Sequence, residues 1–191
     1  MNQLLNRHFL TLVRRETERF LALYKQTVMP GLISTALYIL VFGKALGKKI
    51  DANGLEVNYT LYIIPGLIMM AVINHAYQNS SSSIMQAKFL RFIEDILITP
   101  LSGLEITLGY IIGGTFRGVL NGVLVIFLSW LLTGFFPNNL LLTLIYLFTV
   151  AWAFSGAGVI IGILAKTWDS IMVFTNFIFT PLIFLGGVFY S

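Results

Sequence analysis

The sequence predicts an all-α, polytopic transmembrane helix bundle. Of its 191 residues, 57% are hydrophobic and only 10% are charged, and the mean hydropathy is +0.86. A soluble domain of this length needs far more polar surface. The charges are also unevenly placed, and the stretches between them approach the roughly 20 apolar residues that cross about 30 Å of hydrocarbon. The absence of cysteine excludes a disulfide framework and a thiolate metal site.

Residues 1–26 are predicted to form an amphipathic interfacial helix. Apolar residues recur at helical spacing, while Arg7, Arg14 and Glu18 share the opposite face. Such a helix lies in the membrane interface with its basic face toward anionic lipid head groups. Glu16 falls on the apolar face and is the one defect in the pattern.

Residues 27–191 are predicted to form the transmembrane domain, with five spans. Between the first two spans, a polar loop over 44–58 contains glycines and Asn53, which favour turns over regular structure. A tight connection over 134–139 joins the third span to the fourth. The spans cover about residues 27–43, 60–78, 106–132, 140–165 and 171–190.

The positive charges indicate that the N-terminus is cytoplasmic. In that orientation eight Lys and Arg residues lie inside and three lie outside, in the loop over 44–58, which follows the positive-inside rule. The net charge of +4 therefore reports topology, and no nucleic-acid partner is expected. Five spans then leave Ser191 outside. The cytoplasmic set is Arg7, Arg14, Arg15, Arg19, Lys25, Lys88, Arg91 and Lys166.

Residues 79–104 are predicted to form a cytoplasmic loop whose segment 86–102 is a short mixed-charge helix, closed by Pro100. Its charges are either a solvated face or part of a helix that docks into a groove on a soluble partner. For docking, the relevant side chains are Lys88, Phe89, Arg91, Phe92, Glu94, Asp95 and Pro100.

Arg117 is the only charged residue well inside a predicted span. An arginine at the centre of a span costs roughly 2.5–3.5 kcal/mol on insertion scales, so it should face the bundle interior or a wet cavity. It is either a substrate-path or gating residue, or a structural arginine bonded to carbonyl groups of a neighbouring helix.

Two predicted spans carry glycines at four-residue spacing. In lipid, helices associate largely through close packing over small residues. These repeats indicate either tight packing within the subunit or a sliding or dimer surface. The glycines are Gly114, Gly118, Gly122, Gly158 and Gly162.

The sequence contains no convincing catalytic or metal site. His8 and His75 have no cysteine or clustered carboxylate beside them, and the serines at 80–83 lack an obvious base. The segment 162–167 superficially matches a phosphate-binding P-loop but lacks its second glycine. The chain is therefore expected to be neither an ATPase nor a binder of any cofactor.

Several segments resemble ABC-2 type transporter permeases of the bacterial inner membrane. The stretch from Ala87 to Ser102 is similar to their cytoplasmic loop, whose pattern is K-F-x-R-x-I-E-[ED]-[IL]-L-[IV]-x-P. The resemblance extends over nearly the whole chain. Its other segments are 64–70, 109–118, 165–169 and 180–191.

The resemblance implies the transmembrane subunit of an ABC exporter, acting as a homodimer with six spans per subunit. ATP and Mg²⁺ would bind to a separate ATP-binding subunit. The N-terminal helix matches the family's interfacial helix, and the segment 86–102 matches the helix that contacts the ATPase. Because the chain stops at Ser191, after the fifth span, it is interpreted as a fragment that lacks the sixth.

Two other classes of function remain open at this point. An ATPase-independent secondary transporter or channel would need titratable groups or a filter inside the membrane, and only Arg117 is available. A structural membrane scaffold would leave the mixed-charge segment 86–102 without a role.

Overall fold

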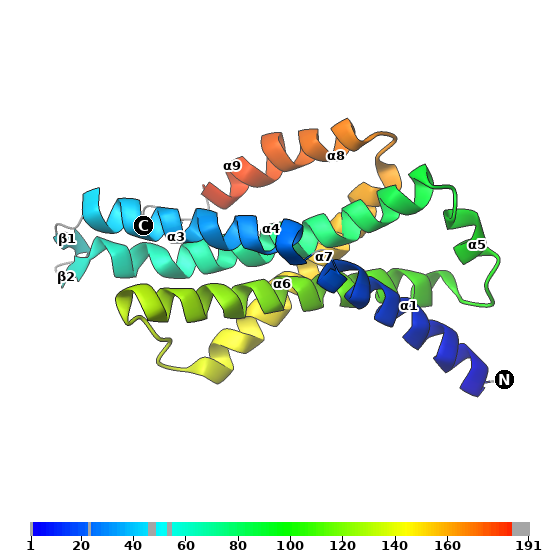
Figure 1. The fold of residues 1–191 in the computed structure, drawn as a ribbon, viewed down its shortest axis with the longest axis horizontal. Coiled ribbons are helices and arrows are strands. Elements are labelled where there is room, and N and C mark those ends of the chain that lie inside the picture. Colours follow the sequence, from blue (N-terminus) through cyan, green and yellow to red (C-terminus); the bar gives the residue numbers. More distant parts are fainter. Residues whose placement is uncertain (1, 23, 46–48, 53–54, 185–191) are drawn as a thin grey trace.

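The computed structural model describes residues 2–22, 24–45, 49–52 and 55–184, and they form a helix bundle with one short hairpin (Figure 1). The elements, in chain order, are α1 (Asn2–Ala22), α2 (Tyr24–Thr27), α3 (Met29–Ala45), β1 (Lys49–Ala52), β2 (Leu55–Asn58), α4 (Tyr59–Phe89), α5 (Ile93–Leu97), α6 (Gly103–Thr133), α7 (Leu140–Leu164), α8 (Trp168–Phe174), the π-helix η1 (Thr175–Phe179) and α9 (Thr180–Ile183).

Three helices among the described residues, α4, α6 and α7, are long and apolar enough to cross a membrane. The all-α membrane bundle predicted from the sequence is therefore confirmed. Helix α3 has 17 residues and spans about 26 Å, while the run Trp168–Ile183 is shorter still. The predicted fifth span continues to residue 190, which lies outside the described residues, so the count of five spans remains a prediction.

Helix α4 continues far beyond the predicted end of the second span at residue 78, and the prediction that 79–83 belongs to a loop is wrong. These polar residues are helical and mostly buried. Ser81 donates to the carbonyl of Tyr77 over 2.9 Å, within α4 itself. Ser80 lies 2.6 Å from Ser155 of α7. A polar run stays in the bundle because every hydroxyl finds a partner there, whereas sequence reasoning assigned it to solvent.

The loop predicted over 44–58 contains the antiparallel hairpin of β1 and β2. Lys49 pairs with Asn58, and Ala52 pairs with Leu55. The expectation of turns without regular structure is therefore wrong for 49–52 and 55–58. The sequence signal was available, because an Asn-Gly pair between two short runs is a strong hairpin indicator. The glycines and Asn53 named in that prediction lie outside the described residues.

Helices α6 and α7 have well-defined ends. The Ser102 side chain accepts from the backbone N–H of Glu105, whose carboxylate accepts in return from the N–H of Ser102, so α6 begins with a capping box. Gly134 ends α6 in the left-handed region, with φ of 73°. Asn139 then caps α7 by accepting from the N–H of Leu142. These caps produce the tight connection predicted over 134–139.

The glycine repeats of α6 and α7 face α4 inside the subunit. A Cβ added to Gly118 would lie 2.8 Å from Ala76 Cβ of α4 and 3.1 Å from Ala151 Cβ of α7. A Cβ added to Gly158 would lie 2.5 Å from the carbonyl oxygen of Tyr77. The same holds for Gly114, Gly122 and Gly162, so of the two alternatives left open by the sequence, the structure places these glycines in packing within the subunit.

A second glycine stripe on α6 receives α1. A Cβ added to Gly109 would lie 2.6 Å from the Leu12 side chain, and one added to Gly113 would lie 2.7 Å from Glu16 Cβ. Leu12, Glu16 and Phe20 are all buried. The face of α1 that carries these residues is therefore packed on the bundle, and the interfacial position of α1 remains a prediction.

Replacing Gly158 by alanine should destabilise the protein, because the new methyl group would meet the backbone of α4, which cannot rotate away. The expected loss in the free energy of unfolding is about 1–3 kcal/mol. Unfolding of the purified protein in detergent measures it. Gly156, two residues earlier in α7, has its nearest neighbour at 3.9 Å. Alanine there should stabilise by about 0.5–1 kcal/mol, and equal effects at the two sites would refute close packing at Gly158.

Candidate functional site

The segment between α4 and α6 differs from the single helix predicted over 86–102. Helix α4 extends to Phe89, and the chain then turns through Arg91, whose φ of 60° is in the left-handed region. Only Ile93–Leu97 form the separate helix α5. The charges and apolar residues of the segment are therefore divided between a helix end, a turn and a five-residue helix.

Lys88 does not belong to the surface of this segment. Its Nζ donates to the carbonyl oxygens of Gly162 at 2.9 Å, Ile163 at 2.5 Å and Ala165 at 3.1 Å. These are among the last carbonyl groups of α7 or directly follow it, and they have no partner within the helix. Lys88 is thus a cationic cap that ties the end of α4 to the end of α7.

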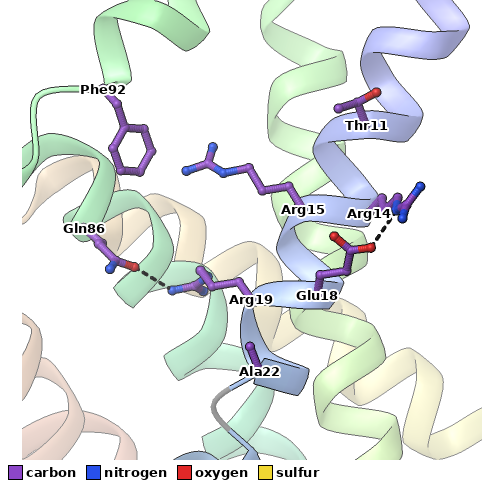
Figure 2. A pocket seen from close by; sticks show the side chains of 8 residues that line it. All are labelled: Thr11, Arg14, Arg15, Glu18, Arg19, Ala22, Gln86 and Phe92. Atoms are coloured by element: carbon purple, nitrogen blue, oxygen red, sulfur yellow. Dashed lines mark hydrogen bonds and ion pairs between the residues drawn. The ribbon is translucent and has the colours of Figure 1, made fainter.

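Part of the Phe92 side chain packs against other residues of the same chain. Its ring packs beside the cluster of buried residues that contains Ile96 and Tyr110. The guanidinium carbon of Arg15 in α1 lies 4.4 Å from the ring centroid, a cation–π contact. Figure 2 shows Arg15 extending from α1 toward Phe92. Of the two aromatic residues that the sequence analysis names for docking, Phe89 is the exposed one, with 70% of its surface accessible.

Two apolar side chains that the sequence reasoning did not select are also strongly exposed in this segment. Ile98 is 82% exposed and Leu97 is 66% exposed. Their signal was visible as hydrophobic residues outside any span, beside Glu94 and Asp95. We call this region the α5 surface; its members are Phe89, Leu90, Arg91, Glu94, Asp95, Leu97, Ile98, Pro100 and Leu104, all exposed.

Glu16 connects α1 to α4 and is no defect in the pattern. Its side chain is fully buried, accepts from the Ser83 hydroxyl at 2.5 Å, and lies 3.6 Å from Arg19. Arg19 also donates to Gln86 at 3.1 Å, as Figure 2 shows, and to the carbonyl of Asn79. Burial lowers the pKa of the Arg19 guanidinium, while the Glu16 carboxylate opposes that shift. A carboxylate on the packed face of α1 thus neutralises a partly buried arginine.

A cavity of about 640 Å³ lies between α1 and the α4–α5 region. Arg14, Arg15 and Arg19 line it together with Phe92, as Figure 2 shows. Glu18 pairs with Arg14 at 2.6 Å, and this exposed pair raises the pKa of Arg14. The cavity carries a positive excess at the joint between α1 and the α5 surface.

Arg117 lies in the bundle interior with only 6% of its surface exposed. It donates to Asn79 Oδ1 at 3.4 Å and to the carbonyl oxygen of Thr27 at 3.5 Å. It also lies 3.4 Å from His75 Nδ1, which must accept because a guanidinium has no acceptor atom. Asn79 Oδ1 accepts from Arg19 as well, so one amide links the α1 joint to Arg117.

A second cavity of about 640 Å³ lies between α3, α4 and the α8–η1 run, and Arg117 reaches it from α6. We call it the polar groove. Hydroxyl and amide side chains from each of these elements alternate with apolar ones along it. The lining includes Ser34, Asn74, His75, Gln78, Arg117 and Trp168. Among the described residues no three His, Asp or Glu side chains gather as metal ligands.

Replacing Glu16 by glutamine should loosen α1, because Arg19 would then be buried beside a neutral amide. Removing one partner of a buried pair typically costs about 3 kcal/mol. We expect a lower unfolding temperature in detergent and faster tryptic cleavage within α1. Glu18→Gln on the exposed face of the same helix is the matched control and should change little. Equal behaviour of the two variants would show that the Glu16 contacts do not hold α1.

The family model for ABC-2 type transporters matches residues 7–191. The chain is 41% identical over 178 residues to the inner membrane transport permease YadH of Escherichia coli K12, covering 93% of this chain and 69% of that protein. The YadH proteins of Escherichia coli O157:H7 and Shigella flexneri match equally. No solved structure matches significantly. The chain therefore belongs to the ABC-2 type transporter family of membrane proteins.

Proposed function

We propose that this chain is the transmembrane permease subunit of an ATP-driven exporter in the bacterial inner membrane. It acts as a homodimer with a cytoplasmic N-terminus, and a separate subunit binds and hydrolyses ATP with Mg²⁺. Family membership and relatives named inner membrane transport permeases support a role in transport. The observation that carries the ATP-driven part is the α5 surface, which combines exposed apolar and acidic side chains at one end of the bundle.

The α5 surface has the chemistry of a docking site for a soluble protein. Leu97 and Ile98 would fill a groove of a partner, because contiguous exposed apolar side chains outside a span are typical of interaction sites. Glu94 and Asp95 would lie at the edge of such an interface, where charges steer association.

A chain of contacts leads from Phe92, which directly precedes α5, to the bundle interior. Phe92 holds Arg15 of α1, and four residues later Arg19 holds Asn79 of α4. Asn79 in turn accepts from Arg117. A displacement of α5 would therefore be transmitted through α1 to the centre of the bundle, on the side where the polar groove lies.

Transport then follows from two packings of the same bundle. ATP would hold two partner subunits together, and their approach would move the α5 surfaces of two permease copies. The helix bundles would tilt from an inward-facing to an outward-facing packing, and ATP hydrolysis would return them. Such a switch requires that the partner contacts differ in free energy between the two states.

Replacing Leu97 and Ile98 together by serine should weaken recovery of the ATPase subunit with the permease. Loss of a buried apolar anchor costs about 2 kcal/mol, close to a thirtyfold change in affinity. Co-purification from membranes at fixed salt measures the effect. Phe136→Ser, at the opposite end of α6 and also exposed, is the matched control. Unchanged recovery in the double variant would make this segment a solvated connection only.

Charge reversal at the same surface gives a separate test. Glu94→Lys combined with Asp95→Lys should weaken the complex most at low ionic strength, where Coulomb interactions are least screened. Membrane insertion should persist, because neither residue is in a predicted span. A loss of ATPase recovery that is independent of salt would argue against an acidic rim.

The orientation can be tested with single cysteines, since the chain has none of its own. Ser102→Cys precedes α6 and Asn138→Cys follows it, so they should report opposite sides of the membrane. In intact cells a membrane-impermeant maleimide should label residue 138 and leave residue 102 unlabelled until the membrane is opened. The reverse pattern would place the N-terminus outside and exclude a cytoplasmic ATPase at α5.

A further inference from the structure

Arg117 is a buried cation that has no carboxylate partner among the described residues. The ion pairs of that part of the chain join Arg14 to Glu18 and Arg19 to Glu16. The acceptors that Arg117 does have are neutral and lie 3.4 to 3.5 Å away. Charge-assisted hydrogen bonds of arginine are normally near 2.8 Å. Arg117 Nε is buried and has no hydrogen-bond partner there, so the hydrogen-bonding capacity of the guanidinium is incompletely satisfied.

The charges around Asn79 leave a positive excess inside the bundle. Arg19 and Arg117 both donate to Asn79 Oδ1, and the nearby carboxylate is that of Glu16. Two cations and one anion leave one uncompensated positive charge. Buried charge without a counter-charge is unfavourable in a low-dielectric interior, and an anion brought to Arg117 would relieve it.

The polar groove provides the space and the lining for such an anion. Its volume of about 640 Å³ is within the range of small-molecule sites, which is roughly 300–1,000 Å³. Asn74 and Gln78, within one turn of His75 on α4, also line the groove, and the Asn74 amide already donates one hydrogen bond to the carbonyl of Met70. Leu67 and Met70 line the groove further along α4, about 12 Å from His75 to Leu67 by the rise of a helix. The lining therefore combines one anion-binding end with an apolar stretch.

We propose that the polar groove binds an anionic amphiphile, with Arg117 as the receptor for its phosphate or carboxylate group. The apolar part of the ligand lies along Leu67 and Met70. We also infer that the permease transports ligands of this class, and this second step rests on the function proposed above. The binding site itself depends only on the buried cation and the groove.

Binding can be measured through Trp168, which lines the groove, whereas Trp130 and Trp152 do not. Purified permease in an uncharged maltoside detergent would be titrated with decyl phosphate, decyltrimethylammonium and inorganic phosphate. We expect a saturable change in tryptophan fluorescence with decyl phosphate that Trp168→Phe abolishes. Decyltrimethylammonium should give none. Inorganic phosphate should bind at least tenfold more weakly, and equal binding would overturn the amphiphile assignment in favour of a free anion.

Two variants test the assignment of the residues. Arg117→Gln should weaken decyl phosphate binding at least tenfold, and Arg117→Lys should restore a substantial part of it. Ser34→Phe narrows the groove and should reduce binding with Arg117 intact, whereas Ile33→Phe, exposed on the same helix outside the lining, should not. If Arg117→Gln fails to fold, the Ser34 and Ile33 pair still decides the matter. Undiminished binding in Arg117→Gln or Ser34→Phe would overturn the proposal.

The binding experiments can fail or succeed independently of the tests of the proposed ATP-driven export. Binding of decyl phosphate requires neither ATP nor a partner subunit. If the permease recovers no ATPase but binds decyl phosphate through Arg117, the anion site is supported and the proposed ATP-driven export is refuted. If the permease recovers its ATPase but binds decyl phosphate and decyltrimethylammonium equally well, ATP-driven export is supported and the anion site is refuted.

Discussion

The close approach of α4 to α6 and α7 is the constraint on which the rest of the structure depends. In hydrocarbon there is little hydrophobic force between helices, so their association needs van der Waals contact and interhelical hydrogen bonds. Glycine at the contact makes both interactions possible, because it lets the helix backbones approach closely. A Cβ on Gly114 would occupy the place of the Ser80 and Ser155 hydroxyls, which instead lie 2.6 Å apart and bond across α4 and α7. The polar run of α4 is stable in the bundle because α6 and α7 come this close.

The same constraint positions the charged groups. Gly109 and Gly113 let α1 lie against α6, and this brings Glu16 and Arg19 to the side of α4. Asn79 then stands between Arg19 and Arg117. The α1 helix is therefore both a packed element and a connection between the α5 surface and the polar groove. An interfacial helix that rested only on lipid could not connect them.

Sequence reasoning was accurate where a single local property decided the outcome. Long uncharged stretches sufficed for a membrane bundle, and four-residue glycine spacing indicated close helix packing. It failed where the partner of a side chain lay elsewhere in the chain. The sequence predicts Lys88 in a docking surface, but Lys88 caps α7 through three carbonyl groups. Spacing alone predicts a defect at Glu16 and a loop at Ser80, because the partners of these residues, Ser83 and Ser155, are 67 and 75 positions away.

The sequence by itself determined the class of the protein and the identity of its family, since hydropathy and the motif around Glu94 are properties of neighbouring residues. Only the tertiary structure decided which of those residues face outward. It turned Phe92 toward Arg15 and left Leu97 and Ile98 exposed. It also decided the surroundings of Arg117. The hydrogen-bond acceptors that the fold brings to this buried cation are neutral, and a sequence pattern does not reveal them. The physical reason is that burial and charge compensation depend on helices far apart in sequence, which hydropathy and spacing cannot register.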